Sequence, residues 1–78
     1  MKSAPALIRV YGPRGSLVLA GRDEIGLLSL ARGFAGEHGT EVSVTRQTPG
    51  HEERPLVRYR CLSMDRPVLE EREEGDDW

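Results

Sequence analysis

Four stretches of the chain carry strand-like patterns of apolar and polar residues, and they occur in two pairs. Residues 40–46 and 56–62 alternate with a period of two, so that one side of each strand is apolar and the other polar. Residues 6–11 and 16–20 are short runs rich in β-branched, aromatic and other apolar residues. We therefore predict four strands, each paired with its neighbour in sequence.

Turn-forming residues separate the two members of each pair. Gly12, Pro13 and Gly15 lie between the first two stretches, where a four-residue connection favours an antiparallel hairpin. Residues 47–55 contain two prolines, a glycine and two glutamates, which is typical of a loop. A second antiparallel hairpin is predicted around this loop.

Between the two hairpins the apolar spacing changes to i, i+3, i+4, i+7, which predicts an amphipathic helix over residues 24–38. Asp23 is placed as its N-cap, and Gly39 stands where a C-terminal glycine belongs. The apolar face consists of Leu27, Leu30, Ala31 and Phe34.

The order β-β-α-β-β predicts an α+β fold, with one helix packed on one face of a four-stranded, mostly antiparallel sheet. We assign residues 1–64 to this single domain. The expected core is Ile8, Val10, Leu17, Leu19, Leu27, Leu30, Ala31, Phe34, Val42, Val44, Val57 and Tyr59.

Charge divides the chain at the same point. Residues 1–64 hold nine basic and six acidic residues, whereas residues 65–78 hold two basic and seven acidic ones. Blocks of like charge tend to remain solvated, so we expect 65–78 to be a flexible acidic tail outside the core. A short strand or helical turn at 67–69 is the alternative for the start of this segment.

Composition narrows the class of protein. Cys61 is the only cysteine, which excludes an internal disulfide, and neither His38 nor His51 forms a metal-ligand spacing with it. We expect no metal, no cofactor, no signal peptide and no membrane span, and a cytoplasmic location. A 78-residue chain has a small core, so association, most simply as a homodimer, is the expected reinforcement. Arginine in place of lysine at all basic positions but Lys2 suggests a GC-rich bacterial or phage genome.

No catalytic site is predicted. Cys61 falls on the same side of its strand as Val57 and Tyr59, which indicates burial rather than a reactive thiol. The Gly12–Gly15 segment is followed by a strand instead of a helix, unlike a phosphate-binding loop. We therefore expect a protein that is not an enzyme.

The side of the sheet away from the helix is the predicted working surface. Period-two alternation places Arg9, Tyr11, Arg58 and Arg60 there. Arginine and tyrosine are enriched in protein interfaces, and arginines around an aromatic on an open sheet also occur in RNA-binding platforms. An ordinary solvated face is the third interpretation. Three guanidinium groups so close together require a neutralising anion, from a partner, a phosphate or the chain's own tail.

A second candidate interface lies on the back of the predicted helix. Small residues gather there and would allow another backbone to approach: Gly26, Ser29, Gly33 and Gly36. The alternative, which we favour slightly, is that GC-rich codon usage placed these residues on a solvated face.

The function expected from the sequence is a small non-enzymatic interaction module that regulates, inhibits or assists another protein. It binds that protein through its open sheet face. The alternative is a nucleic-acid-binding module that uses the same arginine and tyrosine face.

Overall fold

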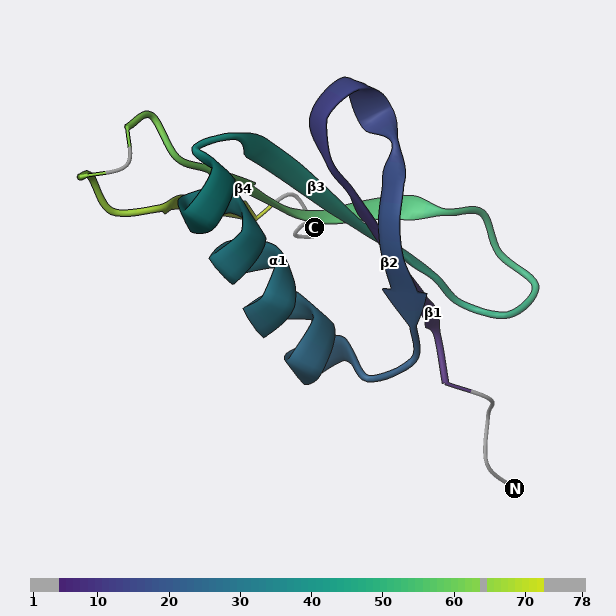
Figure 1. Cartoon of the computed structure of the whole chain (residues 1–78). Helices are drawn as coiled ribbons and strands as arrows, with labels where there is room; N and C mark the ends of the chain where they lie inside the picture. The colour runs from purple at the N-terminus through teal and green to yellow at the C-terminus, as the bar shows by residue number, and fades with distance from the viewer. Residues whose placement is uncertain (1–4, 64, 73–78) are drawn as a thin grey trace.

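The computed structural model describes residues 5–63 and 65–72, and its strands and helix follow the predicted order with one addition (Figure 1). The elements are β1 (Leu7–Tyr11), a 3-10 turn η1 (Pro13–Gly15), β2 (Leu17–Gly21), α1 (Glu24–His38), β3 (Glu41–Gln47), β4 (Arg54–Arg60) and β5 (Leu69–Arg72).

The strands form one sheet in the order β2-β1-β3-β4-β5, and every neighbouring pair is antiparallel. Figure 1 shows α1 lying across one side of this sheet. The predicted α+β layout is thus confirmed, with five strands in place of four. None of the helices in the described part of the chain is long and apolar enough to cross a membrane.

The helix has the predicted bounds because both ends are capped locally. The Asp23 carboxylate accepts a hydrogen bond from the Gly26 backbone N–H at 3.2 Å, and Gly39 ends the helix with a φ of 59°. Leu27, Ala31 and Ala35 face the sheet and are buried. The small alanines let the helix approach the strands along this i, i+4 row.

That contact row turns Leu30 away from the sheet, where it is 57% exposed. The prediction of Leu30 as a core residue was wrong, because Ala35 and not Leu30 completes the buried row. Phe34 is partly buried and packs against the core from the β2 side, close to Val18 and Gly12.

The prediction of Leu17 as a core residue was also wrong, and the pairing of the first hairpin explains why. Val10 lies opposite Leu19 and Tyr11 lies opposite Leu17, so Val18 is an extra residue in β2. This bulge reverses the alternation, so Leu17 turns to the side of the sheet away from α1, where it is 56% exposed. Leu19 stays on the helix side and packs against the core.

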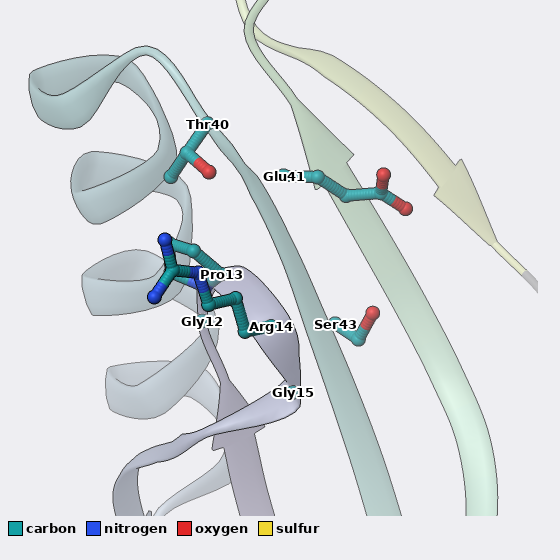
Figure 2. A pocket seen from close by; sticks show the side chains of 7 residues that line it. All are labelled: Gly12, Pro13, Arg14, Gly15, Thr40, Glu41 and Ser43. Atoms are coloured by element: carbon teal, nitrogen blue, oxygen red, sulfur yellow. The ribbon is translucent and has the colours of Figure 1, made fainter.

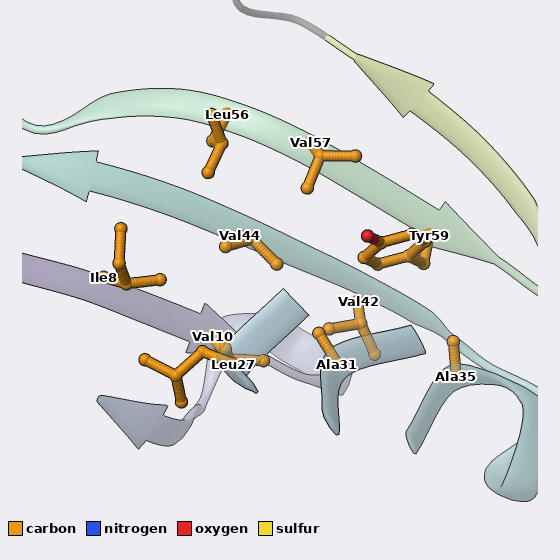
Figure 3. Packing of buried hydrophobic residues seen from close by; sticks show 10 residues of the cluster. All are labelled: Ile8, Val10, Leu27, Ala31, Ala35, Val42, Val44, Leu56, Val57 and Tyr59. Carbon is orange, nitrogen blue, oxygen red and sulfur yellow. The ribbon is translucent and has the colours of Figure 1, made fainter. Parts of the chain in front are cut away.

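A second bulge adds a core residue that the pattern did not predict. Val44 pairs with Val57 and Thr45 pairs with Pro55, which leaves Leu56 without an opposite residue in β3. Leu56 is 1% exposed and, like Val57, belongs to the core cluster (Figure 3). The other buried members are Ile8, Val10, Leu27, Ala31, Ala35, Val42, Val44 and Tyr59.

The fifth strand comes from the stretch that we expected to be an acidic tail. Leu69–Arg72 pair with β4, so the sheet extends past the predicted domain boundary at residue 64. Val68 comes just before β5 and packs partly buried against the core. The rest of the predicted tail, residues 73–78, lies outside the described residues.

Candidate interaction surface

The face of the sheet opposite α1, here called the open face, carries the four predicted partner-binding residues. Strand register aligns Tyr11, Ser43, Arg58 and Glu71 in one row across β1, β3, β4 and β5. The strand neighbours of Tyr11, Ser43 and Arg58 include core residues that face the helix, so these three side chains point the other way. Glu71 shares their face because it pairs with Arg58.

Parallel rows complete the open face on either side. Arg9 lies opposite Thr45 in one row, and Arg60 lies between Glu41 and Leu69 in the other. The structure therefore brings Arg9, Tyr11, Arg58 and Arg60 onto one surface. Their role in binding a partner stays a prediction.

Glu53 organises the β1 side of the open face. It stands just before β4, and its carboxylate accepts hydrogen bonds from the Tyr11 hydroxyl at 2.6 Å and from the Thr45 hydroxyl at 2.5 Å. Its other oxygen lies 3.3 Å from the Arg9 guanidinium, which also donates to the Gln47 side chain at 2.9 Å. One carboxylate thus joins three residues of β1 and β3.

These bonds shift the pKa values of both acidic partners. The hydrogen bond from Thr45, followed by that from Tyr11, lowers the pKa of Glu53 below its ordinary value. The hydrogen bond to Glu53 raises the pKa of the Tyr11 phenol. Near neutral pH the pair is therefore held as a carboxylate and a neutral phenol.

Glu41 and Glu71 neutralise the β4 side of the open face. The Arg58 guanidinium lies 3.3 Å from Glu41 and 3.9 Å from Glu71, and Arg60 lies 3.0 Å from Glu71. The anion that the clustered arginines require is therefore supplied by the chain itself. Part of it comes from the predicted acidic tail, because Glu71 belongs to β5.

The alternation of residues 40–46 puts Glu41 on this face, but the parts that Glu53 and Glu71 play were not predicted. Glu53 lies 42 residues from Tyr11 in sequence, and it occurs in a stretch with no periodic pattern. The one available signal was the excess of positive charge on the predicted face, which required carboxylates from somewhere in the chain.

A shallow cavity of about 400 Å³ adjoins the open face at the first hairpin turn (Figure 2). The turn residues 12–15 line it together with Thr40, Glu41 and Ser43. Figure 2 shows the Arg14 guanidinium and the Glu41 carboxylate pointing in different directions. Because the polar groups do not converge on one point, this cavity suggests no particular ligand.

Contacts within the chain explain two of the three glycines on the back of the helix. A Cβ on Gly26 would stand 2.5 Å from the Asp23 carboxylate, and one on Gly36 would stand 3.1 Å from Val68. Gly33 faces open space, and Ser29 is exposed. The capping carboxylate and the packing of Val68 account for Gly26 and Gly36 without a partner.

Cys61, His38 and His51 lie in three separate environments in the structure. Cys61 is buried and its thiol donates to the Ser63 carbonyl at 3.0 Å. The His38 ring packs on Phe34 with 4.3 Å between ring centroids, and His51 occupies the exposed turn before β4. Within residues 5–63 and 65–72, no three His, Cys, Asp or Glu side chains form a group able to hold a metal ion.

Comparison with known proteins adds no assignment to this geometry: no family model, no curated protein and no solved structure matches the chain.

Proposed function

We propose that this chain is a non-enzymatic interaction module that binds another protein through the open face. The observation that carries the proposal is the charge balance of this face. Arg9, Arg58 and Arg60 are matched by three carboxylates held within 4 Å of their guanidinium groups. A sheet face that is ordered by its own ion pairs presents fixed donors and acceptors to a partner, with little side-chain entropy left to lose on binding.

The same balance favours a protein over the alternative partner, a nucleic acid. Binding to a phosphate backbone depends on uncompensated Lys and Arg, which displace counterions from the nucleic acid. On the open face each arginine has a carboxylate beside it, and these carboxylates would repel phosphates. Tyr11 is hydrogen-bonded to Glu53 and is the one aromatic residue that the described residues place on this face, whereas RNA-binding sheets stack two or three bases.

The arginine side chains remain accessible to a partner. Those of Arg9, Arg58 and Arg60 are 26%, 38% and 40% exposed. We also propose that the chain acts in a reducing compartment such as the cytoplasm, a location that its single free cysteine supports.

The test begins with the full chain immobilised and exposed to proteins of its native host. Binding of the captured protein is then measured by titration with the double variant Arg58→Ala with Arg60→Ala. The control is Arg32→Ala with Arg66→Ala, which removes the same charge from the exposed side of the helix and from the β4–β5 connection.

We expect the open-face variant to lose partner binding while the control retains it. Equal binding by both folded variants would contradict the proposal. A parallel titration with single-stranded DNA and RNA separates the alternative, since affinity for nucleic acid that falls steeply with added salt would favour that function instead.

A further inference from the structure

Strand β5 is attached to the sheet with little burial. All four residues, Leu69–Arg72, are exposed, and the strand contacts the sheet only along the edge of β4. Its register places Leu69 opposite Arg60 and Glu71 opposite Arg58. The backbone ladder and a few ion pairs therefore hold Leu69–Arg72, and the nearest hydrophobic contact is that of Val68, the residue before the strand.

The two glutamates of β5 have different surroundings because successive side chains of a strand point to opposite faces. Glu71 is on the open face and lies against Arg58 and Arg60. Glu70 is on the helix side, opposite Tyr59, and its carboxylate pairs with Arg72 of the same strand at 2.8 Å. Of the two glutamates, Glu71 is the one whose side chain pairs with predicted binding residues.

Glu71 uses only part of the hydrogen-bonding capacity of Arg60. It reaches Arg60 only through Nη2 at 3.0 Å, and the Arg60 Nε atom is buried with no hydrogen-bond partner among the described residues. Its distance to Arg58 is 3.9 Å, too long for a hydrogen bond. An arginine binds a carboxylate most strongly through two parallel N–H···O bonds. A carboxylate placed slightly differently at this position would use the free Nε as well.

We propose that the edge of β4, together with Arg58 and Arg60, is a docking site for an extended acidic segment of the partner protein, and that β5 occupies this site in the uncomplexed chain. This inference rests on the proposed function and specifies its partner. The docked segment adds a strand to the sheet, with backbone hydrogen bonds to β4. It carries an apolar residue at the Leu69 position and a carboxylate two residues later, at the Glu71 position.

Competition between the two strands gives the proposal a measurable consequence. A partner segment binds only the fraction of molecules in which β5 has left the edge, so its apparent affinity equals the intrinsic affinity multiplied by that fraction. Weakening β5 must therefore strengthen binding of the segment. The exposed ion pairs of Glu71 are each weak, so their loss is expected to raise the apparent affinity by about 3–10-fold.

The experiment uses the full chain and a labelled, end-capped peptide with the sequence of residues 67–72 as the probe. Fluorescence anisotropy gives its affinity for the wild-type chain and for the variants Glu71→Gln and Glu70→Gln. Both variants change the same chemical group in the same strand, and circular dichroism checks that each is folded. We expect Glu71→Gln to bind the peptide about 3–10-fold more tightly than Glu70→Gln, which should resemble the wild type.

A second measurement leaves the protein unchanged. The ¹⁵N-labelled wild-type chain is titrated with the peptide and with a peptide that has glutamine at the Glu71 position, while the Arg60 Nε–H resonance is followed by NMR. The acidic peptide should shift this resonance, and the glutamine peptide should shift it much less.

Equal affinities of the two variants, or an Arg60 resonance that responds alike to both peptides, would overturn the inference. Failure here is distinguishable from failure of the proposed function. The captured partner could still require Arg58 and Arg60 while no peptide binds. That result would refute the exchange of strands and leave the open face as the interface.

Discussion

Replacing Glu53 with glutamine tests whether the open face is held in place by this one carboxylate. The side chain accepts hydrogen bonds from Tyr11 and Thr45 and pairs with Arg9, so it connects the start of β4 to β3 and β1. Glutamine keeps the size of the side chain and one acceptor oxygen but removes the charge. The variant therefore isolates the charged part of these contacts.

The magnitude follows from the number of contacts and their exposure. Hydrogen bonds to a charged group contribute about 1.5–3 kcal/mol when shielded, and an exposed ion pair contributes about 0.2–1 kcal/mol. The Glu53 side chain is 34% exposed, and glutamine retains part of the hydrogen bonding. We expect Glu53→Gln to reduce the free energy of unfolding by about 1–2 kcal/mol, where each kcal/mol lowers Tm by about 4–8 °C in a domain of this size.

The neighbouring Glu52 supplies a matched control. It is exposed and has no hydrogen bond or ion pair with any described residue, so Glu52→Gln should change the free energy of unfolding by less than about 0.5 kcal/mol. Urea unfolding followed by circular dichroism measures both variants. Urea is preferred because guanidinium ions would screen the ion pair.

The pH dependence provides a second check with a definite sign. Because the pKa of Glu53 is lowered by folding, its stabilisation is present above the ordinary carboxyl pKa and is lost as the pH falls through the folded-state value. The difference between the wild type and Glu53→Gln should therefore be full near neutral pH and shrink in acid. Equal stability of the Glu53 and Glu52 variants at neutral pH would refute this account of the open face.

The remaining predictions concern the core, the helix glycines and self-association. Ile8 is 1% exposed, so Ile8→Ala should reduce the free energy of unfolding by about 2–5 kcal/mol. Leu30→Ala should cost less than about 1 kcal/mol because Leu30 faces solvent, and equal losses would contradict the observed core. Gly33→Ala should stabilise the helix by about 0.5–1 kcal/mol, since the new methyl meets open space. Gly36→Ala should gain less because its methyl would crowd Val68, and the opposite order in thermal unfolding would count against this packing. Light scattering at micromolar concentration should give a mass near twice 8.7 kDa, as expected for a two-fold dimer, and a constant mass of 8.7 kDa would exclude one.

Local signals made the helix predictable, whereas contacts between strands decided the parts of the fold that were missed. Asp23 and Gly39 cap the helix through bonds to nearby backbone, so its bounds could be read from the sequence. The bulges that expose Leu17 and bury Leu56 arise from pairing with β1 and β3, which no single-strand pattern reveals. The exposure of Leu30 depends on how the helix rotates against the sheet.

The candidate surface was likewise predictable where local signals decide and was missed where contacts between distant residues decide. Period-two alternation placed four of its side chains on one face, because that rule depends only on the backbone of each strand. Of the three carboxylates that neutralise the arginines, Glu41 follows the alternation of β3, whereas Glu53 comes from a loop and Glu71 from a strand with a highly charged sequence. Leu69–Arg72 lack the alternating pattern of a strand, and they pair with β4 next to the arginines that Glu71 neutralises.

One measurement compares the two candidate interfaces directly. Ser43 lies at the centre of the open face, between Tyr11 and Arg58, and Ser29 lies on the exposed back of the helix. Calorimetric titration of the captured partner into Ser43→Trp and Ser29→Trp places the same bulky side chain on each surface. We predict that Ser43→Trp abolishes binding and that Ser29→Trp binds like the wild type. Loss of binding in Ser29→Trp, with binding retained in a folded Ser43→Trp, would contradict the proposal that the open face is the working surface.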